Sequence, residues 1–202
     1  MKKILNIKSS INGENSFSNK LSNAIIDKLK QSNQDIQVET HDLSINPLPH
    51  LDALHFSSFY TPQEVRSEAQ KEAVRLSDLA INEVINADII IIGVGLYNLG
   101  IPSTLKSWID HITRSGITFS YADGYPKGLL VNKKVYLAIA SGAVFSDSAL
   151  KDSDFTESYL RKMLGFLGLT DVTVFRAEGT MMPDFAGNAI PKALEAIEEF
   201  AF

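Results

Sequence analysis

The longest apolar run in the chain is a row of four isoleucines, Ile89 to Ile92, that continues through Gly95 to Leu96. A short apolar run that ends in glycine is typical of a strand buried on both faces of a sheet. A loop follows, and Pro102 then begins a segment whose apolar residues recur at helical spacing. The stretch 88–108 therefore predicts a buried strand, a loop and a helix in succession.

The same periodicities divide the rest of the chain into alternating strands and helices. Short apolar or alternating runs predict further strands at 3–8, 36–39, 134–140 and 172–175. Apolar residues spaced three or four apart predict helices at 17–29, 61–86, 102–115, 154–167 and 191–200. The segment 42–60 is expected to be a long irregular connection, and 117–126 a short extended excursion or hairpin.

Capping residues mark the expected helix starts. Ser16 can cap the first helix, because its hydroxyl can accept a hydrogen bond from a free N–H of the first turn. Thr61 is the expected cap of the second helix, with Pro62 at the first helical position and Glu64 three residues after the cap. The inner stripe of that helix would begin at Val65.

Strand and helix alternate five times, without an internal repeat or a low-complexity linker. Such alternation implies a parallel sheet with helices on both faces. Five strands favour an α/β, flavodoxin-like three-layer sandwich with strand order 2-1-3-4-5, formed as a single domain over residues 1–202. A ligand would bind where the loops after the first and third strands meet, at 9–18 and 95–102.

The loop after the first strand places Ser10, Ser16 and Ser18 around a helix N-terminus. Free N–H groups and the helix dipole favour an anion there, and serine hydroxyls add donors. The patterns GxxxxGK[ST] and GxGxxG are absent, so a phosphate monoester fits this loop better than a nucleoside triphosphate. The alternative is that these serines are only turn and cap residues.

The loop after the central strand, Leu96 to Leu99, combines apolar side chains with Tyr97 and Asn98. Its side chains can form a flat wall for a planar conjugated ring, and its amides can bind the ring's polar atoms. The alternative is an ordinary strand-to-helix loop with Tyr97 in the core. After the fourth strand, the small residues that begin at Ser141 permit close approach of a ligand, or form a plain tight turn.

Composition narrows the possible functions. Without cysteine the chain has no disulfide and no thiolate metal site, and a net charge of -5 argues against nucleic-acid binding. The short apolar run at 89–96 cannot span a bilayer, and no signal-peptide pattern opens the chain, so a cytoplasmic location is expected. The pattern GxSxG of a serine hydrolase is absent, and His111, beside Asp110, is expected to be a surface or dimer contact. No metal spacing is found for the histidines, which are His41, His50, His55 and His111.

Several motifs together resemble the bacterial FMN-dependent NADH:quinone oxidoreductases, also called azoreductases. They are SSINGENSFS, YNLGIPSTLKSWIDHI, GITFSY, LGFLGLTDV and RAEG, and they run nearly from end to end. The resemblance implies a homodimer that binds FMN and uses NADH or NADPH as electron donor. The composition and spacing described above add the expectation of no metal, no nucleic acid and no membrane among the partners.

The resemblance also assigns roles to individual residues. The flavin phosphate would be held by Ser10, Ser16, Phe17 and Ser18. The flavin ring would lie between two loops, formed by Leu96, Tyr97, Asn98 and Leu99, and by Ser141, Gly142, Ala143 and Val144. Phe119 would project over a flavin, in its own subunit or across the dimer, and meet the substrate. No catalytic side chain is implied, because the flavin carries the chemistry.

The chain departs from the usual family pattern within these loops. Leu96 and Leu99 stand where the family often has methionine and phenylalanine. Gly142, Ala143 and Val144 stand where the family often has arginine and two glycines, so a possible cationic contact is removed. These changes alter the expected pocket wall and with it the substrate preference.

The expected reaction is two-electron transfer from NAD(P)H through flavin N5 to quinones and azo compounds, with ping-pong kinetics because both substrates would use one face. A flavodoxin-type electron carrier serving protein partners is the alternative. The extra segments at 42–60 and 117–126 favour the enzyme, since they could build a substrate pocket and a dimer face. A flavin-free binding domain is a third possibility.

Overall fold

A computed structural model describes residues 1–33, 35–121 and 124–202 of the chain. Its main sheet has the strand order β2-β1-β3-β6-β7, with every neighbouring pair parallel. The strands are β1 (Lys2–Lys8), β2 (Ile36–Asp42), β3 (Ile89–Gly95), β6 (Lys134–Ala140) and β7 (Asp171–Ala177). Counting these strands alone gives the order 2-1-3-4-5, so the predicted flavodoxin-like topology is confirmed.

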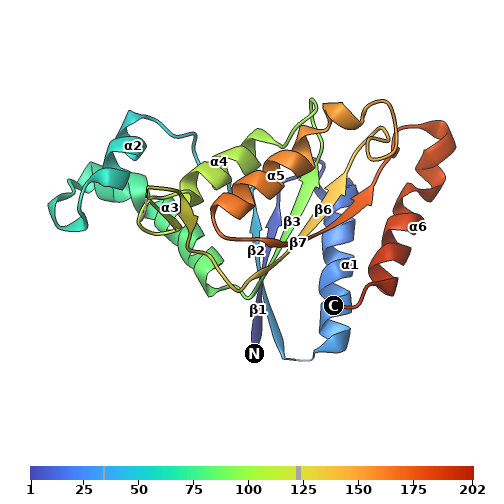
Figure 1. Ribbon diagram of the computed structural model, residues 1–202, viewed down its shortest axis with the longest axis horizontal. Helices are drawn as coiled ribbons and strands as arrows, with labels where there is room; N and C mark the ends of the chain where they lie inside the picture. Colours follow the sequence, from blue (N-terminus) through green and yellow to red (C-terminus); the bar gives the residue numbers. More distant parts are fainter. Residues whose placement is uncertain (34, 122–123) are drawn as a thin grey trace.

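The helices form one layer on each side of this sheet (Figure 1). They are α1 (Phe17–Ser32), α2 (Ala53–Tyr60), α3 (Glu68–Asn86), α4 (Ser103–Ile112), α5 (Phe155–Phe166) and α6 (Pro183–Glu199). The helices α1 and α6 cover one face, whereas α3, α4 and α5 cover the other. Each layer therefore buries a separate apolar cluster against the sheet.

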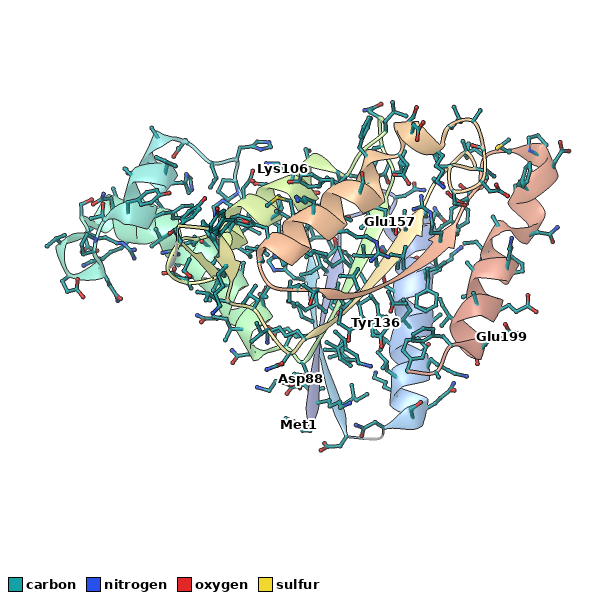
Figure 2. The ribbon with its side chains drawn as sticks, viewed as in Figure 1. Met1, Asp88, Lys106, Tyr136, Glu157 and Glu199 are labelled. Atoms are coloured by element: carbon teal, nitrogen blue, oxygen red, sulfur yellow. The ribbon has the colours of Figure 1, made fainter. Side chains whose placement is uncertain are left out.

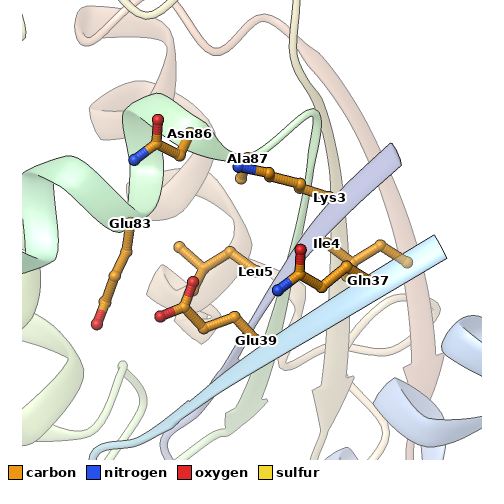
Figure 3. Close-up of a pocket in the computed structure, with 8 residues that line it drawn as sticks. All are labelled: Lys3, Ile4, Leu5, Gln37, Glu39, Glu83, Asn86 and Ala87. Carbon is orange, nitrogen blue, oxygen red and sulfur yellow. The ribbon is translucent and has the colours of Figure 1, made fainter. Parts of the chain in front are cut away.

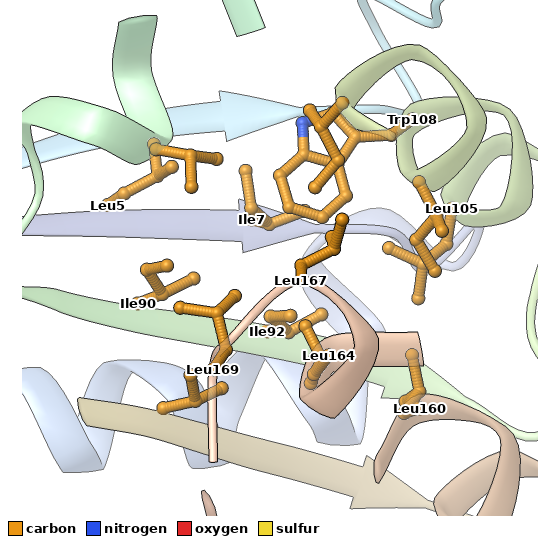
Figure 4. Close-up of a cluster of buried hydrophobic side chains, with 14 of the residues drawn as sticks. Leu5, Ile7, Ile90, Ile92, Leu105, Trp108, Leu160, Leu164, Leu167 and Leu169 are labelled. Atoms are coloured by element: carbon orange, nitrogen blue, oxygen red, sulfur yellow. The ribbon is translucent and has the colours of Figure 1, made fainter. Parts of the chain in front are cut away.

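The isoleucine row of β3 shows how the sequence builds both clusters. All seven residues of β3 are buried, because the strand lies between β1 and β6 and has helices on both faces. Successive side chains of a strand point to opposite faces, so Ile89 and Ile91 pack toward α1 and α6. Ile90 and Ile92 pack toward Trp108 and the leucines of α5 in the other cluster (Figure 4).

Two predicted helix starts are wrong. The Thr61 hydroxyl donates to the Ser57 carbonyl at 2.9 Å, so it closes α2 rather than opening the next helix. The start of α3 is instead fixed by a capping box, in which Ser67 Oγ accepts from the Gln70 N–H and Gln70 Oε1 accepts from the Ser67 N–H. Val65 precedes the helix and is 70% exposed.

The last helix begins earlier than predicted. Pro183 occupies the start of α6, and Pro191, the predicted start, lies inside the helix. A proline at the first turn costs no intrahelical bond, so Pro183 suits that place. The segment 42–60, expected to be irregular, contains the eight-residue helix α2, whose cap is the Asp52 carboxylate.

The segment after α4, predicted as an extended excursion or a hairpin over 117–126, is a hairpin whose second strand lies just beyond those bounds. Its strands, β4 (Phe119–Ser120) and β5 (Lys127–Gly128), pair antiparallel. One residue of the expected turn, Asp123, lies outside the described residues. Across the described part of the chain, none of the helices has both the length and the apolar character needed to cross a membrane.

Candidate functional site

Three loops meet at the edge where the strands of the main sheet end. The loop after β1 is joined to β3 by the Ser9 N–H and the Ser9 hydroxyl, which donate to the Gly93 carbonyl at 3.2 Å and 2.7 Å. The loop after β3 is joined to β6 by a bond from the Leu96 N–H to the Ala140 carbonyl. The three loops predicted to bind a ligand are therefore brought to one edge.

The loop after β1, residues 9–18, contains the serines predicted to bind a phosphate and is called the serine loop below. It leads into helix α1. Ser16 Oγ accepts from the Asn19 N–H at 3.2 Å and lies 3.1 Å from Ser18 Oγ, so the predicted cap is confirmed. Ser10, Ser16 and Ser18 are all at most 3% exposed. The first N–H groups of a helix have no partner within it, and buried hydroxyls next to them form a donor set suited to an anion.

A cation that the sequence reasoning overlooked lies at the same helix start. The Lys20 ammonium is 5.3 Å from the centre of the Phe17 ring. Lys20 is outside the loop in sequence, but it is only one turn into α1, so its charge is available near an anion bound at the helix start. Spacing from the cap residue was the signal that could have identified it.

The loop after β3 is a tight two-residue turn. Tyr97 and Gly100 exchange two backbone hydrogen bonds of 3.0 Å, and the residues between them, Asn98 and Leu99, have φ angles of 49° and 69°. Positive φ at both central positions is the pattern of a type I′ turn, which asparagine tolerates and leucine does not favour. Backbone strain is therefore stored at Leu99. This residue belongs to the loop 96–99 that is predicted to line a flat ring, called the ring loop below.

Tyr97 connects this turn with the serine loop. Its ring lies over Gly95, where a Cβ would come within 2.6 Å of Tyr97 Cε2, so any larger residue there would displace the ring. Its hydroxyl is 3.2 Å from Ser10 Oγ. Tyr97 is half-buried and lines an open cavity, so the alternative of a core tyrosine is not what the structure has.

That cavity has a volume of about 700 Å³, within the range for small-molecule sites. Tyr97, Asn98 and Ile101 line it from the loop after β3, and Phe155 and Tyr159 line it from α5. The two aromatic residues of α5 were not predicted as site residues. They are four residues apart on one helix, so the tertiary packing of α5 alone brings them to the cavity.

The loop after β6 is not an isolated tight turn, because a series of backbone hydrogen bonds joins it to the segment after β7. The N–H groups of Gly179, Thr180 and Met181 donate to the carbonyls of Ala143, Ser141 and Gly142 at 3.0 to 3.1 Å. The Met181 side chain covers Gly142. Ala143 and Val144 line a second groove, of about 620 Å³, against α6. This predicted loop thus shares the sheet edge but not the first cavity.

Phe119 does not reach that cavity. It is 8% exposed and belongs to the core cluster beneath α5, where its ring centre lies 4.6 Å from that of Phe166. Packing on this face turns the ring inward, so the expectation of a projecting phenylalanine is corrected to a core position. The neighbouring Tyr121 ring, 5.5 Å from Phe119, is 60% exposed.

His111 is likewise a buried side chain and not a surface contact. It is 0% exposed, and its Nε2 lies 2.8 Å from the Pro49 carbonyl, which ties α4 to the segment before α2. Burial is the largest influence on its pKa and lowers it, although the hydrogen bond with Pro49 opposes this. His111 therefore supports the fold at a distance from the three loops.

A smaller pocket lies at the opposite end of the sheet (Figure 3). Lys3, Glu39 and Glu83 are among its lining residues, and its volume is about 90 Å³. That volume is well below the several hundred Å³ of typical ligand sites. It is too small for a flavin ring.

Two of the three loops, those after β1 and β3, fit the parts of FMN. Buried hydroxyls and the N-terminus of α1 match a phosphate monoester, and the ring loop beside the cavity of about 700 Å³ matches a flat conjugated ring. The residues of the serine loop and of the ring loop are linked through the Ser10–Tyr97 contact. One continuous ligand could therefore contact both.

Comparisons with known proteins agree with the fold. Residues 2–201 match a family whose members have a flavodoxin-like fold. The FMN-dependent NADH:quinone oxidoreductase of Herminiimonas arsenicoxydans is 44% identical over 200 residues, with 98% of each chain covered. That of Mesorhizobium japonicum is 43% identical over 196 residues, which are 96% of this chain and 93% of the relative.

Solved structures give the same result. An azoreductase from Bacillus anthracis matches with a TM-score of 0.90 at 30% identity, covering 98% of this chain and 97% of the other. An FMN-dependent NADH-azoreductase from the same species, solved in complex with FMN, shares the fold with a TM-score of 0.83 at 23% identity over 98% of each chain. The class is thus that of proteins with a flavodoxin-like fold. Within it, the chain belongs to the family of FMN-dependent NADH:quinone oxidoreductases.

Proposed function

We propose that this protein is an FMN-dependent enzyme that transfers two electrons from NADH to quinones and azo compounds. The Ser10–Tyr97 contact carries the proposal, since it joins a phosphate-type donor set to a ring-sized cavity. Relatives at 44% and 43% identity have the corresponding names. The RAEG and YNLGIPS motifs on which the resemblance rests lie at this edge.

The residues of each loop have separate tasks in this proposal. The hydroxyls of Ser10, Ser16 and Ser18, with the first amides of α1, including that of Phe17, would hold the phosphate. Leu96, Tyr97, Asn98 and Leu99 would line one part of the ring, and the loop from Ser141 to Val144 would flank its far edge. Bound FMN would supply the redox chemistry by accepting a hydride equivalent and passing on two electrons.

The protein itself positions the reactants. Tyr97, Phe155 and Tyr159 give the cavity aromatic walls on which a nicotinamide or a quinone can lie flat. Donor and acceptor would use this one cavity in turn, which predicts ping-pong kinetics. No side-chain nucleophile or general base is required, because these residues only bind and orient.

We also propose a homodimer. The segment around α2 exposes large apolar side chains, with Phe56 60%, Tyr60 66% and Val65 70% exposed. The rings of Phe56 and Tyr60 lie 5.1 Å apart on α2, so they form a continuous patch. Exposed apolar patches of this kind mark interaction surfaces. Light scattering on the purified protein would give twice the mass of 22.2 kDa, and Phe56→Glu would reduce it toward one.

The decisive experiment is the visible spectrum of the purified protein, followed by addition of NADH with and without a small quinone. Yellow protein that consumes NADH steadily only with the quinone supports the enzyme. Flavin-containing protein that reacts with neither substrate would favour an electron carrier for protein partners. Colourless protein that takes up no added FMN would overturn the proposal in favour of a flavin-free binding domain.

A further inference from the structure

Arg176, on β7, is the centre of a cluster of three carboxylates. Its Nη1 is 2.7 Å from Glu157 Oε2, its Nε is 3.2 Å from Glu178 Oε1, and its Nη2 pairs with Asp154. The side chains of Arg176, Asp154 and Glu178 are only 15%, 9% and 11% exposed. Burial, the largest influence, lowers the pKa of Arg176, but the carboxylates together outweigh it and raise the pKa above its ordinary value. The Arg176 guanidinium therefore keeps its positive charge at the centre of this cluster.

Two of these carboxylates also bind backbone. Asp154 caps α5, with its Oδ1 accepting from the Thr156 N–H at 2.8 Å. Glu178 Oε1 accepts from the N–H groups of Phe145 and Ser146, each at 3.1 Å, just beyond the predicted loop that starts at Ser141. Arg176 thus connects the first turn of α5 to the loop after β6.

The first turn of α5 holds the other loop as well. The Phe155 N–H donates to the Leu99 carbonyl at 3.1 Å. Leu99 has the strained φ of 69°, so this bond helps keep the turn between Tyr97 and Gly100 in a conformation that leucine does not favour. A chain of direct bonds therefore runs from the ring loop through α5 and Arg176 to the loop after β6.

The third carboxylate differs from the other two. Glu157, labelled on α5 in Figure 2, bonds Arg176 and Arg161. It is 28% exposed, and neither loop is among its bonded partners. Removing its charge therefore tests the ion cluster without removing an anchor of either loop.

We infer that Arg176 is a positioning residue that sets the spacing of the two loops flanking the flavin ring, acting through Asp154 and Glu178. The inference rests on the proposed FMN site. Without the guanidinium, the buried carboxylates of Asp154 and Glu178 would lack their shared counter-ion. They would move apart, together with the backbone segments whose N–H groups they bind. The loops would then separate while the sheet and the serine loop stay in place.

The first experiment compares Arg176→Met, Arg176→Lys and Glu157→Gln in FMN affinity, visible spectrum of the bound flavin, and kcat and KM for a quinone. Arg176→Met is expected to weaken FMN binding about tenfold and to shift the flavin bands toward those of free FMN. Arg176→Lys keeps the charge but lacks the planar fork, so it should restore part of the affinity. Glu157→Gln should remain within about twofold of wild type.

A second pair of variants tests the link through α5 without touching the charges. Phe155→Pro removes the N–H that binds Leu99 and suits the helix, because proline is favoured at the first helical position and Asp154 has extended angles. Phe155→Ala keeps that N–H and removes the same ring. The flavin bands of Phe155→Pro should therefore shift further than those of Phe155→Ala.

The outcomes separate the inference from the proposed function. If wild-type protein takes up no FMN, the proposed function fails. If wild type binds FMN, and folded Arg176→Met binds it with wild-type affinity and spectrum, the positioning role is overturned. Should Arg176→Met not fold, identical spectra for Phe155→Pro and Phe155→Ala would overturn it instead.

Discussion

The Tyr97 hydroxyl lies 3.2 Å from the Ser10 hydroxyl, and this contact joins the loop after β3 to the loop after β1. We expect Tyr97→Phe to weaken FMN binding about threefold to tenfold, the usual value of one hydrogen bond, with little effect on turnover. Tyr97→Ala should also slow turnover, because the cavity loses an aromatic wall, yet it should still bind flavin. Fluorescence titration with FMN and steady-state kinetics measure the two effects. Apo protein from Tyr97→Ala would contradict the assigned role.

The phosphate assignment is tested by a cap residue that can carry charge. Aspartate caps a helix about as well as serine, so Ser16→Asp should leave thermal stability nearly unchanged. It would nevertheless place a negative charge against the phosphate and weaken FMN binding by about tenfold or more. Ser67→Asp, at the cap of α3, is the matched control and should not alter the affinity. Equal affinities for the two variants would refute the assignment.

The hairpin is tied to the turn after α5 by a contact between two glycines, Gly128 and Gly168. A Cβ on Gly128 would lie 2.0 Å from the Gly168 backbone nitrogen, so an alanine there forces the two backbones apart. Gly128→Ala should lower the free energy of unfolding by about 2–4 kcal/mol. Gly187→Ala in α6 meets no atom within 4 Å and should raise it by up to about 1 kcal/mol. Chemical denaturation measures both, and equal effects would be inconsistent with the contact.

The pKa values of two histidines are shifted in opposite directions, so we expect opposite dependences of stability on pH. The pKa of buried His111 is lowered in the folded state, so protonation favours the unfolded chain as the pH falls below the ordinary value of 6.5. His111→Gln, which can still donate to the Pro49 carbonyl, should remove this loss of stability between about pH 7 and 5. Melting temperatures measured across that range test it, and an unchanged slope in His111→Gln would disprove it.

For His41, we expect stability to change with pH in the opposite direction. Its side-chain hydrogen bond with Glu83, at 2.9 Å, is the largest influence and raises its pKa, although burial opposes it. The pair therefore contributes full stability below the ordinary pKa of 6.5, and the contribution is lost as the pH rises through the raised pKa. His41→Asn should lower the melting temperature near pH 5.5 more than near pH 8.5. An equal loss at both values would argue against the ion pair.

The sequence by itself determined the order of elements and the position of the site. Alternation of strands and helices, and the isoleucine row of β3, fix a parallel sheet, because a strand apolar on both faces has to be covered on both. Loops that follow such strands end at one edge, so the grouping of the loops after β1, β3 and β6 also followed from the sequence.

Local signals were less reliable where two candidates competed. Thr61-Pro62 resembles a helix start, but the capping box at Ser67 and Gln70 is satisfied on both sides and determines the start of α3. Pro191 resembles a first-turn proline, but Pro183 already fills that place. In each case the decision depended on hydrogen bonds that the sequence pattern does not reveal.

Only the tertiary structure decided which side chains face the cavity. Phe119 turns into the core because Phe166 packs against it, whereas Phe155 and Tyr159 reach the cavity because α5 lies beside the loop after β3. The Arg176 cluster joins Arg176 to Glu157 and Asp154, which are 19 and 22 positions away, and no periodicity connects them. Periodicity fixes which face of an element is apolar, but the partner of that face is set by contacts between segments distant in the chain.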